Sequence, residues 1–148
     1  MPHFTVPISA QGPVVDAAIM VSAARQSALH HANLQVPAPQ IVRALIDTGA
    51  SMSGVDPSVL VALGLSPTGE ADIHTPSTGG IPVSTPTYDV RIAIVSGRSG
   101  DSHFVSETIQ VVSTELTAQG LQVLIGTDIL ESFILHYNGA EKVFSLCY

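Results

Sequence analysis

Most of the chain consists of short apolar runs, rich in Val, Ile and Thr, which are separated by clusters of Gly, Pro and Ser. Runs of this length and composition predict strands, because an amphipathic helix needs a longer pattern with a period of 3.6 residues. The alanines within residues 14–22 leave a helix open there as well. The pattern predicts an all-β fold. The expected strands cover residues 4–8, 14–22, 41–46, 71–76, 81–83, 88–95, 104–112, 123–125, 133–137 and 143–146.

One helix is predicted over residues 57–63. Asp56 is a good N-cap, and Pro57 suits the first helical position because that position needs no N–H donor. Gly64 suits the left-handed position that follows a helix. The apolar residues of this segment fall on one face, which is expected to pack against the core.

A second short helix is expected after Gly126, where Asp128 and Glu131 have the spacing of a capping box. Residues 24–40 carry no clear pattern. They are expected to form an irregular insertion with one or two helical turns at most, because Pro37 and its neighbours end any helix.

Two hairpins are predicted from their turn residues. The segments 71–76 and 81–83 flank Ser77-Thr78-Gly79-Gly80, and a Gly-Gly pair favours a tight hairpin tip. Prolines lie in and beside these strands, so the hairpin is expected at the edge of a sheet and projecting from it. An Asn138-Gly139 turn predicts a closing hairpin near the end of the chain.

Composition and charge narrow the class of protein. The 148 residues suit a single domain over 1–148 with its own core, and the net charge is −7 with five Lys and Arg scattered along the chain. The scattered Lys and Arg residues form no basic patch, so a nucleic-acid partner is not expected. Cys147 is the single cysteine, which rules out an internal disulfide framework and a Cys-rich metal site. The adjacent His30 and His31 lack the i, i+4 spacing of helical metal ligands, so a solvated loop is expected there.

The amino-terminal residues lack the basic and apolar regions of a signal peptide. The longest apolar stretch, residues 14–24, is interrupted by Asp16 and is too short to span a bilayer. A cytoplasmic protein without membrane association is therefore expected.

The stretch Ala44-Leu45-Ile46-Asp47-Thr48-Gly49-Ala50-Ser51 carries the candidate chemistry. An apolar strand delivers one carboxylate, Asp47, to a sharp turn. A carboxylate shielded from solvent is costly unless hydrogen bonds or a function hold it there. The alternative is a buried acid that caps a turn in a non-catalytic domain. Thr48 and Ser51 offer hydroxyl groups, but no positioned base accompanies them for a serine mechanism.

The Asp47-Thr48-Gly49-Ala50 sequence, followed about 75 residues later by Leu124-Ile125-Gly126 and a short helix, resembles the retropepsin-like aspartic proteases. The resemblance is strongest over residues 40–146. It implies a closed β-barrel with one or two short helices and a flap hairpin. It also implies an aspartic endopeptidase that needs two Asp47 carboxylates.

The chain has one Asp-Thr-Gly and no internal repeat, so the resemblance implies a homodimer with two-fold symmetry and a shared active site. A polypeptide is the implied substrate, and no cofactor or metal is implied. Viral members carry Arg where this chain has Thr127, so an intersubunit ion pair built on that Arg is not expected. A non-catalytic retropepsin-fold module for dimerisation or peptide binding is the alternative.

The resemblance also assigns roles along the chain. Asp47 is the catalytic half of the pair, and Thr48 is expected to hydrogen-bond across the two-fold axis. The loop of Asp47 is supported by its neighbours Gly49 and Ala50. The flap, which contacts substrate, contains Thr78, Gly79, Gly80 and Ile81. A second loop, which passes the first, contains Leu124, Ile125 and Gly126.

Overall fold

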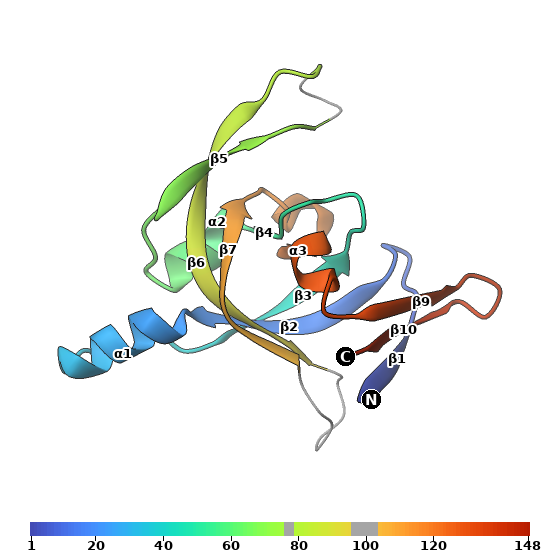
Figure 1. The fold of residues 1–148 in the computed structure, drawn as a ribbon, viewed down its shortest axis with the longest axis horizontal. Coiled ribbons are helices and arrows are strands. Elements are labelled where there is room, and N and C mark those ends of the chain that lie inside the picture. The colour runs from blue at the N-terminus through green and yellow to red at the C-terminus, as the bar shows by residue number, and fades with distance from the viewer. Residues whose placement is uncertain (76–78, 96–103) are drawn as a thin grey trace.

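The computed structural model describes residues 1–75, 79–95 and 104–148, and its main feature is a closed β-barrel (Figure 1). Within these residues six strands pair in the order β2-β3-β8-β4-β7-β6, and β6 pairs back onto β2 to close the barrel. β5 extends the sheet beyond β6. The barrel and hairpin strands are β2 (Val14–Val21), β3 (Gln40–Ile46), β4 (Gly54–Val55), β5 (Gly69–Ile73), β6 (Val83–Val95), β7 (Phe104–Ser113) and β8 (Val123–Ile125).

The all-β expectation is confirmed, and residues 14–22 form a strand rather than a helix. β2 lies between β3 and β6 and pairs antiparallel with both, which buries Ala17 and Ala18. β4 was not predicted, since two residues are too few for a periodic pattern, yet it joins β8 to β7.

A smaller sheet brings the two ends of the chain together. β1 (His3–Pro7), β10 (Val143–Cys147) and β9 (Ile134–Asn138) pair antiparallel in that order, with β1 at an edge as Pro7 requires. Side chains from this sheet and from the barrel pack in one apolar cluster. Its largest fully buried members include Phe144, Leu146, Ile19, Ile92, Ile94 and Ile125.

The closing hairpin has a longer turn than expected. Asn138 is the last residue of β9 and pairs with Val143, so residues 139–142 form the loop. The Asn138 side chain accepts a hydrogen bond from the Glu141 N–H at 3.1 Å. Asn138 therefore starts a four-residue loop instead of occupying the centre of a two-residue turn.

Three α-helices lie outside the sheets in the described residues, and two of them begin differently from expectation. α2 (Pro57–Ala62) is capped by Asp56, as predicted. α3 (Thr127–Leu130) has Gly126 rather than Asp128 at its N-cap, so the predicted capping box is wrong. α1 (Ala23–His31) replaces the first half of the expected irregular insertion, and the Ser22 side chain caps it by accepting from the Arg25 N–H.

His30 and His31 lie in the last turn of α1 rather than in a loop, and both are exposed. No helix in the described part of the chain is long and apolar enough to cross a membrane.

The hairpin of β5 and the first half of β6 projects from the barrel (Figure 1). Its edge position confirms what the prolines predicted. Gly79 and Gly80 have φ angles of 62° and 83°, which glycine adopts without strain. Thr78 lies outside the described residues.

Candidate active site

Asp47 stands where two parallel strands end side by side. β3 pairs in parallel with β8, with Ile46 opposite Ile125, so the residues that follow both strands emerge at the same edge of the barrel. The Asp47 N–H donates to the Ile125 carbonyl oxygen at 2.9 Å. The carboxylate is half-buried, and its Oδ1 accepts from the Gly49 N–H at 2.9 Å. The side chain is thus held in place by its own loop.

Gly49 and Gly126 both lie close to neighbouring atoms, and Gly126 is required because its neighbours are backbone atoms. A Cβ on Gly49 would lie 3.3 Å from Asp47 Oδ1. A Cβ on Gly126 would lie 2.8 Å from the Met52 carbonyl carbon and 2.9 Å from the Ala50 oxygen. Backbone atoms cannot move aside as a flexible side chain does. The second loop therefore passes directly against the loop of Asp47.

Further hydrogen bonds join these two loops. The Thr127 N–H donates to the Ala50 oxygen at 2.8 Å, and the Gly126 N–H donates to Ser53 Oγ at 3.0 Å. Ser53 in turn donates to Asp128. Sequence reasoning missed Ser53, and it assigned Asp128 to a helix cap.

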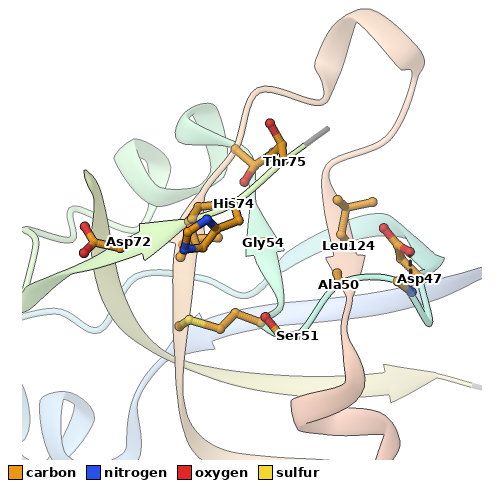
Figure 2. Close-up of a pocket in the computed structure, with 13 residues that line it drawn as sticks. Asp47, Ala50, Ser51, Gly54, Asp72, His74, Thr75 and Leu124 are labelled. Carbon is orange, nitrogen blue, oxygen red and sulfur yellow. Dashed lines mark hydrogen bonds between the residues drawn. The ribbon is translucent and has the colours of Figure 1, made fainter. Parts of the chain in front are cut away.

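A cavity of about 340 Å³ opens beside Asp47. Figure 2 shows that its walls come from separate elements: the loop after β3 supplies Asp47, Ala50 and Ser51, whereas β5 and the residues after it supply Asp72, His74 and Thr75. The other lining residues are Gly49, Met52, Gly54, Ile73, Val112, Thr114 and Leu124. Apolar side chains thus form part of the lining, and polar groups form the rest.

The charge of this cavity is acidic. Asp47 and Asp72 line it together with His74, and no Lys or Arg is among the described lining residues. Within the described part of the chain no group of three or more His, Cys, Asp or Glu side chains has the arrangement of a metal site. The arrangement offers a carboxylate to a reacting group and an apolar surface to a side chain.

The predicted site residues separate into two groups. Asp47, Gly49, Ala50 and Leu124 line the cavity, and Gly126 and the fully buried Ile125 support it from behind. Thr48 is exposed next to it.

The hairpin tip lies elsewhere. Among the described residues, Gly79, Gly80 and Ile81 do not line the cavity, and Ile81 is 72% exposed. Asp72 and His74 take that place. Ile73, which lies between them, lines the cavity as well, so no alternation of faces along the predicted strand marks these residues in the sequence.

Comparison with known proteins agrees with this fold. Residues 34–129 match the model of a family described as aspartyl protease. Among solved structures, a retropepsin-like aspartic protease from Rickettsia conorii is similar, with a TM-score of 0.55 and 16% sequence identity over 97% of this chain and 89% of that chain. At this identity the likeness shows a shared fold. No curated protein matches the sequence.

Proposed function

The chain belongs to the aspartyl protease family, and on that premise we propose that it is an aspartic endopeptidase whose active site contains Asp47 from each of two copies. The observation that carries this proposal is the Asp47 carboxylate itself. It is half-buried, fixed by the Gly49 N–H, and lines a cavity large enough for a substrate side chain.

The chemistry requires two carboxylates in different protonation states. Two carboxyl groups about 3 Å apart cannot both ionise, because their negative charges would repel each other, so the pair shares a proton. The ionised carboxylate takes a proton from water, which attacks the carbonyl carbon of the peptide bond. The protonated carboxyl donates a hydrogen bond to the carbonyl oxygen. As the C–N bond breaks, the departing nitrogen receives the proton that the first carboxylate took from water. The two apparent pKa values belong to the pair rather than to either residue.

A second copy of the chain supplies the second carboxylate. The sequence contains one Asp-Thr-Gly, and an isologous two-fold contact places the same residue of both copies on a common axis. Thr48 is exposed beside Asp47, and we expect its hydroxyl to hydrogen-bond across the two-fold axis. In this arrangement one chain holds half of a site.

The substrate is an extended polypeptide segment. β5 is the outermost strand of its sheet, so its free N–H and C=O groups can add a further strand. Met52, Val112 and Leu124 offer the cavity an apolar surface for a substrate side chain. The tip residues Gly79 to Ile81 would close over the bound peptide and exclude water.

Peptide cleavage by three proteins across pH 4 to 7 tests this function. The wild type and Asp16→Asn, which removes an exposed carboxylate from β2, are expected to cleave equally. Asp47→Asn is expected to lower kcat by about 10²–10⁴-fold, as loss of general acid–base catalysis does. Equal cleavage by Asp47→Asn would show that the proposal is wrong, and peptide binding without cleavage would favour the non-catalytic alternative.

Sedimentation tests the dimer, since a strict monomer under the assay conditions contradicts a shared site.

A further inference from the structure

Ser53, which is buried, and Asp128, which is half-buried, form a hydrogen-bonded pair between the two loops of the candidate active site. The Ser53 N–H donates to Asp128 Oδ2 at 2.8 Å, and Ser53 Oγ donates to Asp128 Oδ1 at 2.7 Å. Ser53 is fully buried. The two residues lie 75 positions apart in the sequence, so this pair is a tertiary contact rather than a local cap.

The hydroxyl of Ser53 is used in both directions. It gives its one hydrogen to Asp128 and accepts the N–H of Gly126 at 3.0 Å. Asp128 Oδ1 also accepts from the Ile129 N–H at 2.9 Å. A carboxylate is the side chain that satisfies this set, because it accepts at both oxygens and donates at neither. Neither residue lines the cavity, so neither is placed to touch a substrate.

The pair completes a frame around Asp47. The loop that begins at Asp47 is fixed at its start by the bond to the Ile125 oxygen and in its middle by the bond from Thr127 to Ala50. Ser53 fixes its far end through Asp128 and Gly126. Removal of the Ser53 hydroxyl leaves the buried Gly126 N–H without an acceptor and releases one end of the frame.

We propose that Ser53 and Asp128 are positioning residues, which set the place of the Asp47 carboxylate through the second loop. This inference rests on the proposed function. A catalytic group must be held within about 0.5 Å of its productive position, and a displacement of about 1 Å lowers a rate by roughly 10²-fold. The pair does not act on the substrate itself.

Ser53→Ala tests the proposal, and Ser58→Ala is its matched control. Ser58 Oγ donates to Asp56 Oδ1 at 2.6 Å, so the control removes the same kind of bond at the start of α2, outside the two loops. Ser53→Ala is expected to lower kcat about ten- to a hundredfold with KM changed less than about twofold. Ser58→Ala is expected to lower Tm and leave kcat and KM unchanged.

The pH profile separates positioning from general destabilisation. When two coupled carboxylates move apart, the gap between their apparent pKa values narrows. The acidic and basic limbs of the plot of kcat/KM against pH are therefore expected to approach each other in Ser53→Ala and to stay in place in Ser58→Ala. Asp128→Asn is a second variant for the case that Ser53→Ala does not fold. The side-chain amide of asparagine has one NH₂ group in place of a carboxylate oxygen, and this NH₂ would face a group that also donates. The same changes are therefore expected.

Amide hydrogen exchange tests the positioning without an assay of activity. Ser53→Ala is expected to exchange the Asp47, Gly126 and Thr127 amides at least about tenfold faster than the wild type, since opening the frame exposes them. The proposal is overturned if Ser53→Ala and Asp128→Asn exchange these amides at the wild-type rate. It is also overturned if these two variants keep the wild-type kcat and pH profile. A wild type without Asp47-dependent cleavage overturns the proposed function instead, and the exchange measurement still decides whether Ser53 and Asp128 fix the loop.

Discussion

Asp56 carries a buried carboxylate that links α2 to the segment after β7. Its Oδ1 accepts from the N–H and hydroxyl of Ser58, and its Oδ2 accepts from the Leu116 and Thr117 N–H groups at 2.8 and 2.9 Å. Burial alone would raise the pKa of this carboxyl, but the hydrogen bonds from Ser58, Leu116 and Thr117 outweigh burial and hold the pKa well below its ordinary value of 3.8. The folded protein thus favours the ionised form.

This lowered pKa fixes the sign of a pH effect on stability. The contribution of the Asp56 charge is fully present above pH 3.8 and is lost as pH falls toward the lower pKa of the folded state. Asp56→Ala is expected to lower the free energy of unfolding by about 2–4 kcal/mol at pH 6, because it removes a helix cap and leaves buried donors unpaired. The difference from wild type is expected to shrink between pH 4 and pH 2.

Urea unfolding at several pH values measures this difference. The control is Asp16→Asn, since Asp16 is exposed on β2. A difference between wild type and Asp56→Ala that stays constant down to pH 2 would contradict the assignment of the effect to the Asp56 charge.

At the level of single residues, sequence reasoning succeeded where the signal is local. The cap at Asp56 follows from the residues beside it, and the sharp turn after an apolar strand marks Asp47. Asp128 was misassigned because its decisive partner, Ser53, lies far away in the sequence. A local Asp-x-x-Glu spacing competes poorly with a buried serine that offers two donors.

Among the elements, the strands were predictable and α1 was not. Each strand that closes the barrel, apart from the two-residue β4, has enough Val, Ile or Thr to show a pattern. α1 shows none because Leu29 is its one buried residue. Its start could have been found from Ser22, which was assigned to the end of the preceding strand.

The hairpin of β5 and β6 is the element whose change should separate activity from stability. Its tip contains Gly79 and Gly80, both with positive φ, and a Cβ added to either would meet no atom within 4 Å. Alanine at both positions strains the turn by about 1–2 kcal/mol per residue. If the strained tip closes less readily over substrate, kcat/KM is expected to fall by about tenfold for each 1.4 kcal/mol added to the free energy of closure. Little change in Tm is expected, because the tip projects from the barrel.

Gly64→Ala is the matched control for the hairpin. Gly64 has a φ of 62° and equally open surroundings, but it follows α2. This variant is expected to lower Tm and to keep the wild-type kcat/KM. A hairpin variant with wild-type kcat/KM would exclude a role for the tip in closing over substrate.

The whole molecule supports the site through its shared core. The barrel and the terminal sheet bury their side chains in one cluster, which includes Ile125 directly behind Asp47. Rigid strands thus hold the two loops, and the projecting hairpin faces them across the cavity (Figures 1 and 2). The sequence showed one Asp-Thr-Gly and therefore predicted a second copy, but the contact between copies depends on surfaces that no local pattern identifies.

Two copies of Asp47 are proposed to form one site, and a crystal structure of the assembled protein would test this proposal. The quantity to measure is the distance between the nearest carboxylate oxygens of Asp47 in two copies related by a two-fold axis. We expect a separation of about 3 Å, which is close enough for the two carboxyl groups to share a proton. An assembly that keeps the two carboxylates too far apart to bind one water molecule would contradict it.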